Sequence, residues 1–169
     1  MKLPTPLTLF HRIRSRCVKR WCYYLLMNAY LPHFGAGIRF TYIAPDLMTI
    51  RTKMRLHWWN RNFVGTQFGG SLYAMCDASY MILLLEAMGD QFVVWDKAAT
   101  IHFRRPGRGT VRVEFRITPE KITALRETLA HKEKHDEIFP VQVIDDAGTV
   151  VAEVEKVVHF RHKTSLTTA

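Results

Sequence analysis

The segment Gly69–Met88 limits the fold of this chain most, because apolar side chains occupy every side of the helix that it predicts. A glycine pair and Ser71 open the segment, and Asp77 and Glu86 interrupt its apolar run. A helix that is apolar all round must be surrounded by protein. The two charges argue against a membrane-spanning helix, which needs about 20 predominantly apolar residues.

Period-two alternation of apolar and polar residues predicts strands on both sides of this helix. The expected strands cover residues 38–43, 47–58, 92–104, 110–117, 138–144 and 149–160. The last two pair as a hairpin through a turn at 145–148. The alternation breaks at Lys156 and Val157, which predicts a bulge there. A short helix begins at Pro119 and buries Ile122, Leu125 and Leu129.

Strands and helices in this order do not alternate as a doubly wound parallel sheet requires. We therefore predict the α+β class, with an antiparallel sheet curled round the apolar helix. One domain is expected at residues 37–162, preceded by an extra N-terminal helix within residues 1–36 and followed by a flexible tail at 163–169. The length of 169 residues suits a single domain of this kind.

The N-terminal segment carries most of the net charge of +9, because residues 1–45 hold seven Lys or Arg residues and no Asp or Glu. A helical pattern at 7–30 is amphipathic, with an apolar stripe formed by Phe10, Ile13, Cys17, Trp21, Leu25 and Asn28. Such a helix either lies on a membrane surface or docks on its own domain. We favour docking, and the Arg-rich start also leaves an organellar transit peptide open.

The loop before the apolar helix carries the strongest functional signal. Gly69 and Gly70 open the helix, so their N–H groups are free to face a ligand at close range. Such donors suit the oxyanion that forms when water attacks a thioester. No Lys follows the glycines, which excludes a phosphate-binding P-loop. Asp77 lies two turns into the helix, where a carboxylate needs a partner or a function.

The run Asn62…Gly65-Thr66…Gly69-Gly70…Asp77 resembles the hotdog acyl-CoA thioesterases of the phenylacetyl-CoA type. It is most similar to a bacterial branch with Phe-Gly-Gly, where Phe68 replaces the family's His. The similarity covers about residues 38–160. It implies the hotdog fold, an acyl-CoA substrate, no metal or organic cofactor, and a site shared by the subunits of a homodimer or tetramer.

Individual roles follow from the same resemblance. Asp77 is implied as base or nucleophile, Asn62 orients water or substrate, and the Gly70 N–H polarises the thioester carbonyl. Asp96 is the neighbouring polar residue, and we expect it to share a proton with Asp77, which raises one of the two pKa values. Substrate-binding roles are expected for Gly69, Phe68, Thr66, Ser71, Lys97, Arg104, Arg105 and Arg108, the arginines either gripping CoA phosphates or forming a solvated edge.

Other functions have weaker support. A non-catalytic acyl-CoA binding or sensing module is the main alternative, because Phe68 departs from the family pattern. A hydratase or dehydratase is disfavoured because the His–carboxylate pair usual in such enzymes is not visible near the glycines of this chain. No recognised motif supports nucleic-acid binding. His131 and His135 have the spacing of metal ligands on one helical turn but no evident third ligand, so no metal is expected. Three cysteines without a Cys-x-x-Cys pair suit a reducing cytoplasm.

Overall fold

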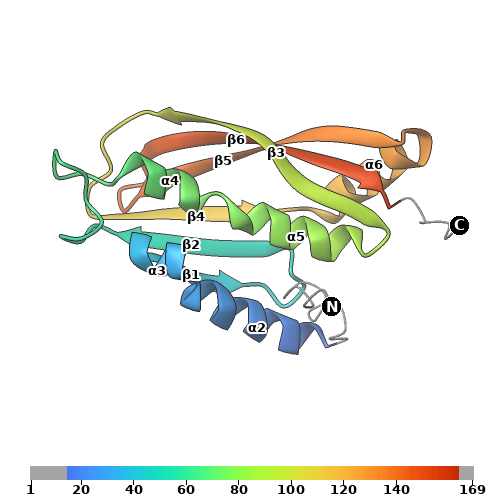
Figure 1. The fold of residues 1–169 in the computed structure, drawn as a ribbon, viewed down its shortest axis with the longest axis horizontal. Coiled ribbons are helices and arrows are strands. Elements are labelled where there is room, and N and C mark those ends of the chain that lie inside the picture. The colour runs from blue at the N-terminus through green and yellow to red at the C-terminus, as the bar shows by residue number, and fades with distance from the viewer. Residues whose placement is uncertain (1–14, 164–169) are drawn as a thin grey trace, which may run out of the picture.

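The computed structural model describes residues 15–163, which form one antiparallel sheet curved round a central helical segment (Figure 1). The sheet has six strands in the order β1-β2-β4-β5-β6-β3. Their bounds are β1 (Ile38–Ile43), β2 (Thr49–Arg55), β3 (Phe92–Phe103), β4 (Thr110–Arg116), β5 (Lys134–Asp145) and β6 (Val150–His162). This is the hotdog arrangement, so the predicted α+β fold is confirmed.

The central helix is interrupted. Helix α4 (Gly69–Met75) and helix α5 (Ala78–Met88) follow each other along the sheet. At the junction the N–H groups of Cys76 and Asp77 bond to the carbonyls three residues earlier, which tightens the turn. The expectation of a helix wrapped all round is therefore wrong at Asp77, whose side chain is 53% exposed.

The central segment also bears on the question of a membrane. By length and composition alone Gly69–Met88 is long and apolar enough to cross one. However, 56% of the most apolar 18-residue stretch of this segment is buried inside the domain, and Leu83 and Leu84 are completely enclosed. It is the core helix of the fold.

Helix α6 (Pro119–His131) confirms the predicted short helix. Its N-cap Thr118 accepts a hydrogen bond from the Lys121 N–H, and Ile122, Leu125 and Leu129 are buried. The prediction that His131 and His135 lie one turn apart on this helix is wrong, because α6 ends at His131 and His135 belongs to β5. There the His135 ring lies 2.9 Å from Glu137.

The predicted bulge at Lys156 and Val157 is also wrong. Lys156 keeps its place in β6, opposite Phe139 of β5 and Ala99 of β3. The irregularity lies on β3, where Lys97 has no partner in the pairing with β6. The apparent break in the alternation arises because an ionisable residue occupies an inward-facing position between Val154 and Val158.

Residues 1–14 lie outside the described part of the chain, so Phe10 and Ile13 of the predicted stripe are untested. Helix α2 (Arg16–Ala29) begins after Ser15, whose side chain accepts from the Val18 N–H. A second helix, α3 (Leu31–Ala36), follows α2 and has Pro32 in its first turn. Gly37, with φ of 78°, closes α3.

Helix α2 docks on its own domain, as we expected. It packs against β1 and next to α5, with Tyr23 and Met27 buried. Its Lys19 ammonium and Tyr23 hydroxyl lie 2.7 and 2.8 Å from the Glu86 carboxylate of α5. The docked face is not the predicted apolar stripe, however, because Trp21 and Leu25 face solvent.

Candidate active site

Lys156 is the residue that sequence reasoning missed. Its side chain is completely buried, and its Nζ atom donates to Asp77 Oδ1 at 2.8 Å, to the Asp77 carbonyl at 2.9 Å and to Asp96 Oδ2 at 2.8 Å. The structure thus brings together two predicted catalytic carboxylates through one ammonium group. We call Asp77, Asp96 and Lys156 the lysine–carboxylate cluster.

Three local features of the backbone bring the side chains of this cluster together. The inward register of β6 points Lys156 toward the central helix. The junction between α4 and α5 places the Asp77 carbonyl and carboxylate over it. The bulge at Lys97 shifts the register of β3 next to Asp96, and bulges commonly redirect side chains in this way. A signal was present in the sequence, because a buried carboxylate predicts a cation partner.

Burial and ion pairing have opposite effects on the pKa values of Asp96 and Lys156. Burial raises the pKa of Asp96, and the hydrogen bond and charge of Lys156 counteract part of that rise. Burial alone would lower the pKa of Lys156, but the hydrogen bonds with both carboxylates outweigh it and the pKa is raised. The groups are therefore bridged by a protonated amine. Asp96 Oδ1 is buried without a hydrogen bond among the described residues.

Two phenyl rings flank the start of α4. A Cβ atom placed on Gly69 would lie 3.0 Å from the Phe103 ring, and one on Gly70 would lie 2.5 Å from the Phe68 ring. Glycines are therefore required for the present packing. The first N–H groups of a helix lack intrahelical acceptors. The N-cap residue of α4, Phe68, offers no side-chain acceptor for them. Ser71, also a predicted site residue, is buried and bonds through its N–H to the Phe68 carbonyl.

Asn62 holds the preceding loop together. Its Oδ1 accepts from the N–H groups of Val64 and Thr66, and its Nδ2 donates to Thr66 Oγ1 at 2.9 Å and to the Gln67 carbonyl at 3.4 Å. Thr66 is buried by these contacts. The amide thus stabilises the loop that leads into Gly69. Its predicted role in orienting water or substrate stays a prediction.

The predicted basic residues differ in availability. Lys97 pairs with Asp136 at 2.5 Å, and Arg104 pairs with Glu153 at 2.6 Å. Arg105 and Arg108 are exposed. A pocket of about 330 Å³ brings several predicted residues together, lined by Asn62, Thr66, Gly69, Arg104 and Arg105 among others. Asp77 and Asp96 do not line it, so one protomer keeps the carboxylates apart from this pocket.

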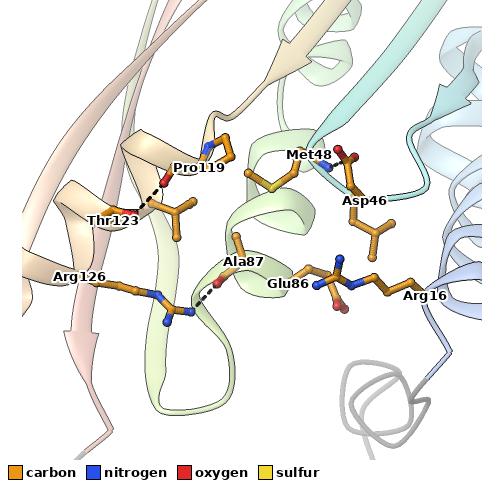
Figure 2. Close-up of a pocket in the computed structure, with 10 residues that line it drawn as sticks. Arg16, Asp46, Met48, Glu86, Ala87, Pro119, Thr123 and Arg126 are labelled. Carbon is orange, nitrogen blue, oxygen red and sulfur yellow. Dashed lines mark hydrogen bonds between the residues drawn. The ribbon is translucent and has the colours of Figure 1, made fainter.

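A second hollow of about 470 Å³ lies between the N-terminal end of α2, the C-terminal end of α5 and α6 (Figure 2). Arg16, Glu86 and Arg126 line it, and Arg126 donates to the Ala87 carbonyl at 2.8 Å. It contains none of the predicted site residues. Within residues 15–163, no group of His, Cys, Asp and Glu side chains forms a metal site.

Cys76 lies beside Asp77 but is buried in the core, where burial raises the pKa of its thiol to about 12. A thiol of that kind is a poor nucleophile at neutral pH. Cys76 is therefore a core residue.

Solved structures share this fold. A Pseudomonas aeruginosa protein of unknown function, described as a probable thioesterase, is 24% identical and gives a TM-score of 0.74 over 95% of this chain and 99% of its own. The PaaI protein of E. coli, from the phenylacetic acid degradation operon, is 13% identical, with a TM-score of 0.58 over 88% and 94% of the two chains. A Haemophilus influenzae thioesterase is 10% identical, with a TM-score of 0.56 over 84% and 90%.

No curated protein matches the chain. A protein-family model described as "Domain of unknown function (DUF4442)" matches residues 19–159. The matched region runs from α2 into β6 and includes all three residues of the lysine–carboxylate cluster. The chain therefore belongs to the DUF4442 family.

Proposed function

We propose that this protein hydrolyses acyl-CoA thioesters, with Asp77 as the carboxylate that assists the attack of water. The contact between Lys156 and Asp77 carries the proposal. The Lys156 ammonium at 2.8 Å holds the Asp77 carboxylate in one orientation, and a positioned carboxylate can accept a proton from a water molecule. The contact uses Oδ1 and leaves half of the Asp77 side chain open to solvent. Water and a thioester can therefore reach it.

The proposed reaction needs no cofactor. Asp77 accepts a proton from the attacking water while the oxygen bonds to the thioester carbonyl carbon. The carbon–sulfur bond then breaks, and the CoA sulfur leaves as thiolate and takes up a proton. The N–H group of Gly70 is the proposed donor to the carbonyl oxygen, because charge develops there during attack.

The second half of the site is proposed to come from another copy of the chain. Strand β3 lies at an edge of the sheet, and Trp95 and Phe103 on it are 40% and 55% exposed. Ala98 and Thr100 are exposed as well. An uncovered edge strand is a template for pairing with a second chain. Pairing through β3 supports a dimer, or a dimer of dimers, in which Asp77 faces the partner's Gly70.

The pocket beside Gly69 is the proposed CoA site. Arg104 and Arg105 line it, and the exposed Arg108 follows Gly107, which also lines it. Guanidinium groups pair with phosphates in a bidentate geometry, which suits the CoA diphosphate. Three free cysteines within the described residues agree with the reducing cytoplasm that we propose as its location.

One observation favours a second candidate, a non-catalytic acyl-CoA binding or sensing module. The Phe68 ring lies against Gly70 at the N-terminal end of α4, where the substrate carbonyl is expected. Phe68 is 55% exposed, so the ring is free to swing aside. Hydrolysis therefore depends on movement of this ring, whereas a binding module does not.

A hydrolysis screen over acyl-CoA chain lengths separates the two functions. The wild type, Asp77→Ala and the exposed-carboxylate control Glu127→Gln are assayed together, and binding of a non-hydrolysable CoA analogue is measured for each. The proposal expects turnover in the wild type and the control, with Asp77→Ala inactive but still binding. Binding without turnover in all three proteins would establish the binding module instead.

A further inference from the structure

Helix α2 presents its more apolar side to solvent. Between Val18 and Ala29 every exposed residue of this helix is apolar: Val18, Trp21, Leu25, Leu26 and Ala29. Trp21 is 52% exposed and Leu25 is 66% exposed. A helix on the surface of a soluble domain normally shows the opposite arrangement, with its polar side outward. We call Val18, Trp21, Leu25 and Leu26 the α2 apolar surface.

Specific hydrogen bonds fix this orientation. Three polar residues of α2 face the domain, and two of them, Lys19 and Tyr23, contact Glu86. Asn28 accepts from the Phe40 N–H at 3.0 Å and donates to the Phe40 carbonyl at 3.1 Å, which ties the helix to β1. Because these contacts hold the helix, Trp21 and Leu25 cannot turn inward without breaking them. The exposed apolar residues continue beyond α2 at Tyr30, Leu31 and Phe34.

The charged residues of the segment that carries this surface all have one sign. Residues 15–45 contain four Lys or Arg residues and no Asp or Glu. The Arg20 guanidinium lies 5.2 Å from the centre of the Trp21 ring, and that of Arg39 lies 4.7 Å from the Phe34 ring. A hollow of about 240 Å³ lies between α2 and β1, with Arg20, Trp21 and Tyr24 on one side and Thr41, Tyr42 and Ile43 on the other.

We infer that the α2 apolar surface docks on an anionic lipid bilayer. Trp21, Leu25 and Leu26 enter the boundary between headgroups and acyl chains, where such side chains are favoured. Arg16 and Arg20 lie at the level of the lipid phosphates, which attract basic residues near the surface. The hollow beside Arg20 has room for a phosphate headgroup.

A second copy of the chain fits this surface less well. In a symmetric contact the same surface meets itself, so Arg20 would approach its own copy, and α2 offers no acidic residue between them. The surface also lies on the β1 side of the sheet, at the edge opposite β3. A dimer that pairs through β3 leaves α2 free. The bilayer contact is therefore independent of the proposed catalytic function.

The test measures binding of the full-length protein to vesicles. Phosphatidylcholine vesicles are compared with vesicles that also contain phosphatidylglycerol, at low and high salt, by co-sedimentation. The double variant Trp21→Ser/Leu25→Ser is compared with the wild type and with Ile138→Ser, which alters an exposed apolar side chain on β5. Light scattering records the mass of each protein without vesicles.

We expect salt-sensitive binding to the anionic vesicles that Ile138→Ser retains. The double variant should bind at least about tenfold more weakly, because two large apolar side chains no longer enter the lipid. Equal binding of wild type and double variant, or equal binding to neutral and anionic vesicles, would overturn the inference. A smaller mass of the double variant without vesicles would assign the surface to a second copy, which also overturns it.

Discussion

The Nζ atom of Lys156 lies 2.8 Å from Oδ1 of Asp77, although 79 positions separate the two residues in the sequence. The contact joins β6 to the junction between helices α4 and α5. Removing a charge from water is costly, and ion pairs of this kind often contribute little net stability. The burial of Lys156 between two carboxylates is therefore better explained by a requirement of the site than by stability alone.

Replacing Lys156 by Met tests the energetic weight of the cluster. The variant keeps the volume of the side chain but leaves Asp96 half-buried without its cation. We expect the free energy of unfolding to fall by about 3 kcal/mol, the usual cost of removing one partner from a buried pair. Urea denaturation followed by circular dichroism measures it.

The double variant Lys156→Met/Asp96→Asn is the control for this loss. Asn carries no charge, so much of the stability that the single change removes should return. A double variant that is as unstable as the sum of the two single variants would show that Lys156 and Asp96 do not interact energetically.

The same lysine makes a prediction about alkaline pH. The hydrogen bonds with Asp77 and Asp96 outweigh burial and hold the pKa of Lys156 above its ordinary value of 10.5. A group whose pKa is raised in the folded state contributes its full stability below the unfolded pKa and loses it as the pH rises through the folded one. The stability difference between wild type and Lys156→Met should thus stay constant up to the ordinary lysine pKa of 10.5 and shrink as the pH rises above it. A difference that grows with alkaline pH would show that the amine is bound in its neutral form.

Much of the fold was readable because the core strands alternate cleanly. Val111, Val113, Phe115 and Ile117 are all buried, as their period of two predicts. The edge strand β3 was readable as a strand, but Phe103, which shares one face of it with Ala99 and Ile101, is exposed in a single protomer. Alternation identifies the inner face of a strand and does not show whether the sheet or a second chain covers it.

The candidate site was readable in part, because Asp77 and Asp96 both bond to the same side chain. Their partner Lys156 was missed because a lysine in an alternating apolar strand was interpreted as a break in register. The docked face of α2 was misassigned for a related reason. An apolar stripe predicts a buried face, but the contacts of Lys19, Tyr23 and Asn28 with the domain depend on partners far away in the sequence.

Two glycine substitutions should differ in cost. A Cβ at Gly37 would lie 2.6 Å from the Asn60 amide, and the φ of 78° strains any other residue. A Cβ at Gly70 would meet only the exposed ring of Phe68, which can move. We expect Gly37→Ala to cost about 1–3 kcal/mol of stability and Gly70→Ala less than about 1 kcal/mol. Urea denaturation ranks them, and equal costs would contradict the assigned geometry.

The shared-site proposal predicts that the protein is at least dimeric at micromolar concentration. Lysine on an edge strand disfavours pairing with another strand, so Ala98→Lys/Thr100→Lys should shift the protein toward the monomer. Ala124→Lys/Ala130→Lys adds the same charge to exposed positions of α6 and should leave the assembly intact. Light scattering measures the mass. A monomeric wild type would contradict the shared site.

The most direct test of the account is the hydrolysis rate of Asp77→Asn on an acyl-CoA that the wild type hydrolyses. Asn preserves the shape of the side chain and removes the proton acceptor. The rate should fall on the order of 100- to 10,000-fold, while binding of a CoA analogue persists and Asn62→Ala loses less. An unchanged rate in Asp77→Asn would contradict the account and remove Asp77 from the mechanism.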